Sequence, residues 1–244
     1  MKIILTNDDG YGAIGIEAMR EILSRDNEVF VFAPSVPQSG MSCSFTTYCK
    51  PLTVHKIDEH SFKVDGTPVD CVLFANAYLQ DDYDMIVSGC NNGYNVSNDI
   101  MYSGTCGACE QGLVFKKKCV AFSSEHFDND RHVKEYVPRV LKYLSDNGLF
   151  SDEYYLNVNL SPAEMPCKGI RITKQYFRSL SKYTLTDLGG DSYTVKHIHD
   201  EDVFDNDDYD VSAVHNGYIS VTPISATNFK QEFYDRMKNT MKRG

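Results

Sequence analysis

The sequence lacks any long hydrophobic run. No part of its 244 residues approaches the roughly 18 consecutive apolar residues that a membrane-spanning helix requires. A signal-peptide pattern is also absent, because the N-terminus leads directly into a predicted strand. We therefore expect a cytoplasmic protein with no membrane partner.

Extended runs of basic residues are missing as well, apart from 116–118. The chain carries 24 Lys and Arg against 34 Asp and Glu, which gives a formal net charge of −10. Such a charge repels polyanions, so we expect no tight binding of duplex nucleic acid. The length and the 42% apolar content suit one large α/β domain or two small ones.

The cysteine pattern offers little support for a disulfide framework or a zinc site. Eight cysteines are present, but the chain is large and has its own apolar runs, so we predict reduced and mostly buried thiols. Cys106 and Cys109 have the spacing of a redox or zinc motif, without a second such pair or a matching His pair. We expect both to be small apolar residues in the first turns of a helix.

The apolar pattern predicts a parallel α/β fold. Residues 3–5 are apolar on both faces, as in a central strand of a parallel sheet. Apolar residues then recur at helical spacing from Ile14 to Leu23, and 29–33 form a second buried run. This βαβ unit implies a right-handed crossover.

The same reasoning extends along the chain. Residues 41–64 have β character, and Thr67 and Pro68 are the expected cap and first residue of a helix to about 79. Residues 174–211 are polar, aromatic and acidic and predict an extension. Further strands are predicted at 84–89, 119–123, 154–160, 169–173 and 217–222, and further helices at 106–115, 129–146 and from about 228.

Four acidic residues in the extension invite comparison with a calcium loop. They are Asp205, Asp207, Asp208 and Asp210, but the glycine and the final glutamate of an EF-hand are absent. We predict a solvated acidic loop there.

An acidic pair follows the first predicted strand. Asp8 and Asp9 precede Gly10 and Gly12, whose backbone freedom suits a sharp turn. The carboxyl edge of a parallel sheet is where ligands bind in open α/β folds. Two adjacent carboxylates repel each other, and a bound cation relieves the repulsion. Taken alone, such a pair is as typical of a turn and helix cap as of a functional site.

Two other predicted strands end in oxygen-bearing residues at the same edge. Ser39 follows the second strand, and Asn91 follows strand 84–89. Carboxylate, hydroxyl and amide oxygens favour Mg²⁺, Mn²⁺ or Ca²⁺ over zinc. Glycines at 40, 89, 93 and 104 and a helix N-terminus near Thr105 suit a phosphate, so phosphoryl transfer by metal-activated water is the simplest chemistry. The alternative is that Asn91, Asn92, Asn95 and Asn98 only tolerate left-handed loop conformations.

The chain resembles the SurE (survival protein E) nucleotidases. The resemblance depends on seven motifs in order: I-L-x-T-N-D-D-G-Y at 3–11, A-P-x-x-x-Q-S-G at 33–40, D-G-T-P-x-D-C-V at 65–72, V-S-G-x-N-x-G at 87–93, Y-S-G-T at 102–105, N-V-N-L at 157–160 and G-Y-I-S-V-T-P at 217–223. A modest departure is Cys90, where the family usually has an aliphatic residue.

The resemblance implies a 5′-nucleotidase, a divalent-metal-dependent phosphomonoesterase of nucleoside 5′- and 3′-monophosphates, with short polyphosphate as a further substrate. One Mg²⁺ or Mn²⁺ per subunit, with Ca²⁺ also accepted, would have Asp8, Asp9, Ser39 and Asn91 as ligands. It implies a Rossmann-like three-layer core. Residues 1–150 would carry the metal site. Residues 151–244 would complete the core and add a β-arm at about 174–211 and a terminal helix that exchange between subunits of a homodimer or homotetramer.

For the mechanism we predict catalytic roles for Asp8 and Asp9, with Asp9 orienting or deprotonating the water. Phosphoryl oxygens would be bound by Asn91, Ser103, Gly104, Thr105 and Gly40. A covalent aspartyl-phosphate is the competing route.

Other protein classes fit the sequence less well. A receiver-like signalling module needs an Asp after its central strand, and Ser88 and Gly89 stand there. A nucleotide-binding regulatory protein without turnover stays open.

Overall fold

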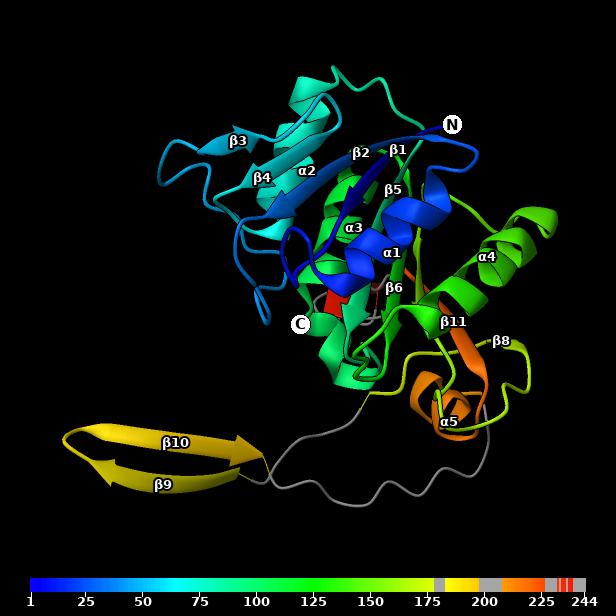
Figure 1. Cartoon of the computed structure of the whole chain (residues 1–244). Helices are drawn as coiled ribbons and strands as arrows, with labels where there is room; N and C mark the ends of the chain where they lie inside the picture. Colours follow the sequence, from blue (N-terminus) through cyan, green and yellow to red (C-terminus); the bar gives the residue numbers. More distant parts are fainter. Residues whose placement is uncertain (178–182, 198–207, 227–231, 233, 236, 239–244) are drawn as a thin grey trace.

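A nine-stranded sheet forms the centre of the part of the chain that the structure describes (Figure 1). The computed structural model describes residues 1–177, 183–197, 208–226, 232, 234, 235, 237 and 238. The strand order is β3-β4-β2-β1-β5-β6-β7-β11-β8. The strands are β1 (Lys2–Thr6), β2 (Glu28–Pro34), β3 (Val54–Lys56), β4 (Ser61–Val64), β5 (Met85–Asn92), β6 (Lys118–Ser124), β7 (Tyr155–Asn159), β8 (Ile170–Ile172) and β11 (Ile219–Ile224).

The central pairings of this sheet are parallel, which confirms the predicted fold class. Strands β4, β2, β1, β5, β6 and β7 pair in parallel, whereas β3 and β11 run antiparallel to β4 and β7. Residues after 150 therefore contribute β7, β8 and β11 to the sheet that the first half of the chain begins.

Helices cover both faces of the sheet, which gives three layers (Figure 1). Helices α1 (Ile14–Leu23) and α4 (Arg131–Asp146) share one core cluster with Ile3 and Leu5, while α2 (Pro68–Tyr78) and α3 (Gly104–Val114) share the other with Ile4. Neighbouring residues of β1 thus point into two different cores. This two-sided burial is the reason why the strand is apolar throughout.

The starts of α2 and α3 follow from capping residues. Thr67 and Asp70 form a reciprocal capping box, and Pro68 is the first helical residue, as predicted. Helix α3 begins two residues before the predicted 106, because the Ser103 hydroxyl accepts from Cys106 N at 3.1 Å. Cys106 and Cys109 are fully buried in α3, which confirms their apolar role, and burial raises the pKa of the Cys106 thiol to about 12. All eight thiols are free.

The predicted β character of 41–64 is only partly correct. Strands occupy 54–56 and 61–64, whereas 41–53 contains none. Local turns replace the strand there: Ser44 N donates to Met41 O, and Cys49 N donates to Thr46 O. The Asp70 carboxylate also binds Thr46 N at 2.8 Å, so this backbone is satisfied without a neighbouring strand.

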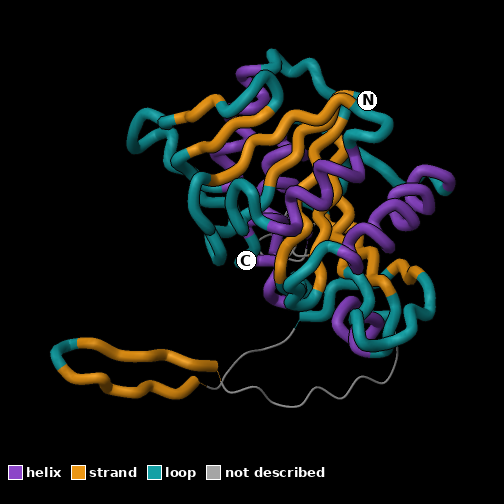
Figure 2. The backbone as a smooth tube through the Cα atoms, viewed as in Figure 1, coloured by secondary structure: helices purple, strands orange, loops and turns teal. Residues whose placement is uncertain are grey.

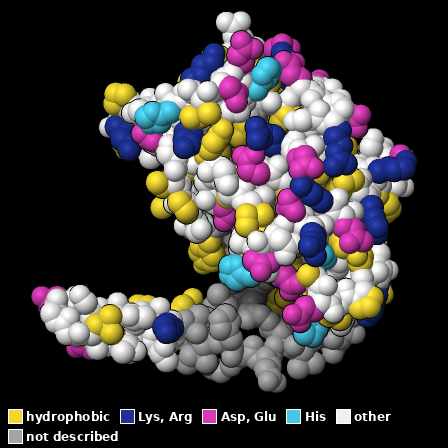
Figure 3. Space-filling view, in the orientation of Figure 1, with side chains coloured by type: hydrophobic (Ala, Val, Ile, Leu, Met, Phe, Trp, Pro, Cys, Tyr) yellow, Lys and Arg dark blue, Asp and Glu magenta, His cyan; other side chains and the backbone are white. Residues whose placement is uncertain are grey.

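The predicted extension contains a β-hairpin and a short helix. Strands β9 (Tyr183–Gly189) and β10 (Ser192–His197) pair antiparallel, and the hairpin stands clear of the sheet (Figures 1 and 2). Several large apolar side chains on it are exposed, including Leu185, Leu188 and Val195, and Figure 3 shows apolar atoms along this element. Helix α5 (Asp210–His215) follows.

The prediction of a solvated acidic loop is wrong for Asp210. This side chain is fully buried, whereas Asp208 is exposed as expected, and Asp205 and Asp207 lie outside the described residues. The predicted terminal helix also lies largely outside them, although the described residues between 232 and 238 are helical. Among the described helices, none has the length and apolar composition to cross a membrane.

Gly15 places α1 directly against the end of β5. A Cβ at this position would lie 1.9 Å from Cys90 O. We expect Gly15→Ala to lower the free energy of unfolding by about 1–3 kcal/mol, because a backbone atom has to move. Urea denaturation measures the change, and Ser24→Ala, at the exposed end of the same helix, should stay within about 0.5 kcal/mol of wild type. A Gly15→Ala protein more stable than wild type would contradict this packing.

Candidate functional site

Three segments predicted to share one edge of the sheet do meet there. Asp8 and Asp9 directly follow β1, Ser39 lies in the loop after β2, and Asn91 lies at the end of β5. Strands β2, β1 and β5 are neighbours, so their carboxyl ends are adjacent. Hydrogen bonds also join the segments, because Gln38 N donates to Asp8 O at 2.7 Å and Asn92 N donates to Asp9 Oδ2 at 3.0 Å.

Asp8 lies over the N-terminus of α3. Its side chain is 4% exposed, and the Thr105 hydroxyl donates to Oδ1 at 2.5 Å while Thr105 N donates to Oδ2 at 3.3 Å. Burial raises the pKa of the Asp8 carboxyl, and the bonds from Thr105 oppose that increase. The partial positive charge of a helix N-terminus further favours the ionised form.

Gly104 permits this close contact between helix and carboxylate. A Cβ at Gly104 would lie 3.0 Å from Asp8 Cβ and 3.0 Å from Pro68 Cγ. A side chain on the first residue of α3 would therefore crowd Asp8 and Pro68.

Asp9 is half-buried and faces the end of β5. Burial raises the pKa of its carboxyl, and the negative charge of Asp8 adds to the increase. Since Asn92 N donates to Oδ2, the Oδ1 atom can still accept another partner. Two adjacent carboxylates with raised pKa values are an arrangement that a cation stabilises.

Asn92 and His126 are site residues that sequence reasoning missed. The Asn92 Oδ1 accepts from Phe127 N at 2.9 Å and lies 3.0 Å from His126 Nδ1, so the loop after β6 joins the same edge. The sequence showed an amide-rich run at 91–98, but only the fold shows that the backbone N–H of Asn92 donates to Asp9.

Asn91 is oriented by its own loop. Its Nδ2 donates to Gly93 O at 2.8 Å, so its Oδ1 is the atom that faces other partners. The pairing of β5 with β6 shifts register between Ser88 and Asn91, as a bulge near a site often does. Gly89 makes the irregular backbone possible, because it has a φ of +116° and its Cβ would lie 2.2 Å from Phe122 O.

The residues predicted to bind phosphate lie at two depths. Ser103, Gly104 and Thr105 are buried beside Asp8, with the Ser103 hydroxyl capping α3 and the Thr105 hydroxyl bonded to Asp8. Ser39 and Gly40 are exposed on the outer side of the edge. The geometry therefore gives Thr105 a definite contact with Asp8 and leaves its phosphate role a prediction.

Buried asparagines support the loop between Asn91 and α3. Asn95 N donates to Asn159 Oδ1 at 2.8 Å, and Asn95 Nδ2 donates to Ser123 Oγ at 2.9 Å. Asn157 and Asn159 both donate to Asn95 O. The N-V-N-L motif on β7 thus fixes this loop from within the core.

The donor set fits a hard divalent cation. Asp8, Asp9, Ser39 and Asn91 offer oxygen atoms, and two adjacent carboxylates provide the negative charge. Within the described ranges, no group of three or more His, Cys, Asp or Glu side chains is arranged to hold a metal. A cation at this edge would therefore depend on hydroxyl and amide oxygens as well as on the acidic pair.

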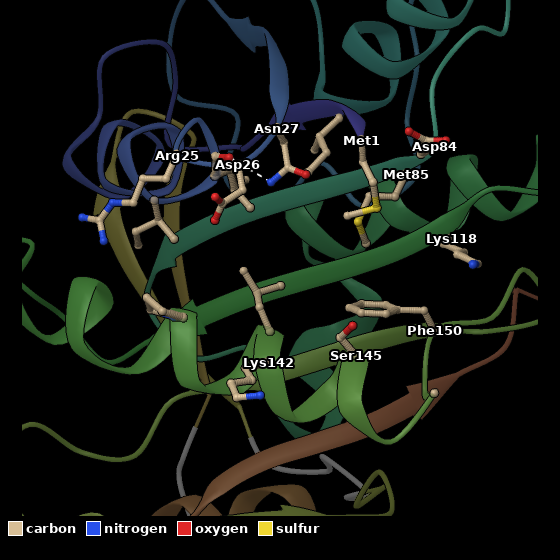
Figure 4. A pocket seen from close by; sticks show the side chains of 16 residues that line it. Met1, Arg25, Asp26, Asn27, Asp84, Met85, Lys118, Lys142, Ser145 and Phe150 are labelled. Atoms are coloured by element: carbon tan, nitrogen blue, oxygen red, sulfur yellow. Dashed lines mark hydrogen bonds between the residues drawn. The ribbon is translucent and has the colours of Figure 1, made fainter.

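A separate cavity lies at the opposite edge of the sheet (Figure 4). Its volume is about 840 Å³, and Met1, Asp84, Met85 and Lys118 line it from the starts of strands. None of the candidate metal and phosphate residues lines it, and Asp8, Asp9 and Asn91 lie at the other ends of β1 and β5. Cavity size alone therefore does not identify the candidate site.

Comparison with known proteins agrees with the resemblance seen in the motifs. A family model described as "Survival protein SurE" matches residues 3–182. A protein named 5′-nucleotidase SurE from Clostridium botulinum (strain ATCC 19397 / Type A) is 32% identical over 244 residues, covering 94% of this chain and 95% of its own. A 5′/3′-nucleotidase SurE from Wigglesworthia glossinidia brevipalpis is 35% identical over 241 residues, covering 95% of this chain and 94% of its own.

A solved structure agrees in fold. The SurE protein from Aquifex aeolicus superposes with a TM-score of 0.83 at 31% sequence identity, covering 99% of this chain and 100% of that one. The likeness extends over the whole chain and is not confined to the sheet.

Proposed function

Since this chain belongs to the SurE family, we propose that it is a 5′-nucleotidase, a divalent-metal-dependent phosphomonoesterase that hydrolyses nucleoside 5′- and 3′-monophosphates. The observation that carries the proposal is the convergence of the acidic pair, Ser39 and Asn91 on one edge of the sheet. The names of the two relatives support the nucleotide as substrate.

Four side chains would hold the cation: Asp8, Asp9, Ser39 and Asn91. One Mg²⁺ or Mn²⁺ per subunit suits these oxygen donors, and Ca²⁺ suits them as well. When bound, the cation supplies positive charge to the phosphoryl oxygens and lowers the pKa of a coordinated water.

The residues of the chain divide the remaining tasks. Asp8 is held in place by Thr105, while the Oδ1 of Asp9, which does not accept from Asn92 N, would orient or deprotonate the attacking water. Ser103, Gly104 and Thr105 at the start of α3, with Gly40 and Asn91, would bind the phosphoryl oxygens. In the competing route an Asp carboxylate attacks phosphorus and forms an aspartyl-phosphate.

Phosphate release from AMP and GMP tests the proposal. We expect release with Mn²⁺ or Mg²⁺ and loss of release after EDTA treatment, with recovery when Mn²⁺ is returned. Nucleotide binding without any release would instead support a regulatory protein. Short polyphosphate belongs in the same panel, as the further substrate that we propose.

We also propose that the segment at about 174–211 and the terminal helix exchange between subunits of a homodimer or homotetramer. The exposed Leu185, Leu188 and Val195 on the hairpin support a protein partner for this element. Light scattering on the purified protein should give the mass of two or four chains, and the mass of one chain would contradict the proposal.

A further inference from the structure

The backbone N–H and C=O of Ser97, which belong to two successive peptide groups, are both held by the C-terminal part of the chain. Ser97 N donates to Asp210 Oδ2 at 2.8 Å, and Ser97 O accepts from Gln175 Nε2 at 2.8 Å. Ser97 starts the 3₁₀ helix η1 (Ser97–Met101), which lies between Asn91 and α3. Its φ of +57° lies in the left-handed region that costs an L residue free energy, so its neighbours have to hold it there.

Asp210 is built into this contact as a buried acceptor. Its Oδ1 accepts from Tyr176 N at 2.9 Å and from Val211 N at 2.8 Å, while Oδ2 accepts from Ser97 N. Burying a carboxylate costs free energy unless such donors compensate. The carboxylate therefore joins three separate backbone positions.

Both residues that hold Ser97 belong to the extension. Gln175 stands just before the segment that carries the hairpin β9–β10, and Asp210 stands just after it. The two bases of this segment are bonded together, because Lys174 N donates to Asp208 O at 2.7 Å and Asp210 N donates to Lys174 O at 2.9 Å. The two contacts with Ser97 therefore come from both ends of the extension, which the bonds at Lys174 join.

The backbone of η1 and a few hydrogen bonds connect Ser97 to the candidate metal site. Within η1, Asp99 O accepts from Ser103 N at 3.0 Å. Ser103 caps α3, and Thr105 in the first turn of α3 donates to Asp8. Asn95, by contrast, is held by strands of the core and does not depend on the extension.

We propose that Asp210 and Gln175 are positioning residues through which the C-terminal extension holds the N-terminus of α3 in its substrate-binding place. The hydrogen bonds that join Asp210 and Gln175 to Ser97 do not depend on the activity of the protein, whereas their effect on KM rests on the proposed nucleotidase function. A subunit whose extension is displaced would keep its sheet and its acidic pair but bind the phosphoryl group more weakly.

Asp210→Asn separates this role from ordinary stability. The Oδ1 of the new amide can still accept from Tyr176 N and Val211 N, whereas its NH₂ group faces the N–H of Ser97, donor against donor. Asp208→Asn is the matched control, because it removes the same charge from an exposed side chain two residues away. Gln175→Ala removes the contact with the backbone C=O of the same residue, Ser97.

Amide hydrogen exchange of the full chain, without nucleotide or cation, is the first measurement. We expect residues 97–105 to exchange about tenfold faster in Asp210→Asn and Gln175→Ala than in wild type, while β1 and β6 keep their protection. Asp208→Asn should match wild type. Unchanged protection at 97–105, or an equal loss over the whole sheet, would overturn the proposal.

AMP hydrolysis with Mn²⁺ is the second measurement. We expect the KM of Asp210→Asn to rise about tenfold with a smaller change in kcat, because a phosphate-binding group is displaced in both ground state and transition state. A wild-type KM together with lost protection would also overturn the proposal. Should wild type release no phosphate, the nucleotidase function fails, and the exchange result alone decides whether the extension holds α3.

Discussion

Asp9→Asn should release phosphate from AMP at least about a thousandfold more slowly than wild type. The new side chain can still accept from Asn92 N, so the end of β5 keeps its contact with residue 9. Its NH₂ group then takes the position of the free carboxylate oxygen and repels a cation. A bound metal ion contributes several kcal/mol of transition-state stabilisation, and about 4 kcal/mol corresponds to a thousandfold in rate.

The comparison for this variant is Asp128→Asn, which removes the same charge from an exposed residue in the loop after β6. It should hydrolyse AMP within about threefold of wild type, because an exposed charge is screened by salt. Initial rates with saturating Mn²⁺ give both values. An Asp9→Asn protein with wild-type rates would remove Asp9 from the site.

Thr105→Val should have the second-largest effect. The substitution keeps the shape of the side chain but removes the hydroxyl that donates to Asp8 Oδ1 at 2.5 Å. A hydrogen bond to a charged group contributes about 1.5–3 kcal/mol, which corresponds to roughly 10- to 100-fold. Since Asp8 is then held less firmly, we expect the Mn²⁺ concentration for half-maximal activity to rise by that factor.

Thr105→Ser keeps the hydroxyl and is the matched control. It should need nearly the wild-type Mn²⁺ concentration, with only a small loss of stability from the missing methyl group at this buried position. Equal Mn²⁺ requirements in the Val and Ser variants would show that the contact with Asp8 does not support cation binding.

Much of the core was predictable because a single physical cause dominates each of its elements. Residues of β1 are apolar on both faces since helices cover both sides of the sheet, so the pattern at 3–5 indicated a central strand. Thr67 and Pro68 indicated the start of α2 through local capping chemistry alone. The convergence of Asp8, Ser39 and Asn91 followed from the rule that parallel strands end at one edge.

The features of the fold and of the site that the sequence did not predict depend on contacts between residues far apart in the sequence. Asp210 belongs to an acidic run typical of solvated loops, and only the fold brings Ser97 N, 113 positions away, to its carboxylate. Residues 41–53 read as β because of their composition, but Asp70 satisfies the Thr46 backbone instead. In the sequence, Asn92 is one of several loop asparagines, and only the fold shows that its backbone N–H donates to Asp9 Oδ2.

A crystal grown with Mn²⁺ tests the central claim most directly, through the anomalous scattering of the metal. The account predicts one strong peak per chain at the carboxyl edge of β1, about 2.0–2.6 Å from oxygens of Asp8, Asp9, Ser39 and Asn91. A peak held by other residues, or no peak from a protein that still needs Mn²⁺ to hydrolyse AMP, would contradict it.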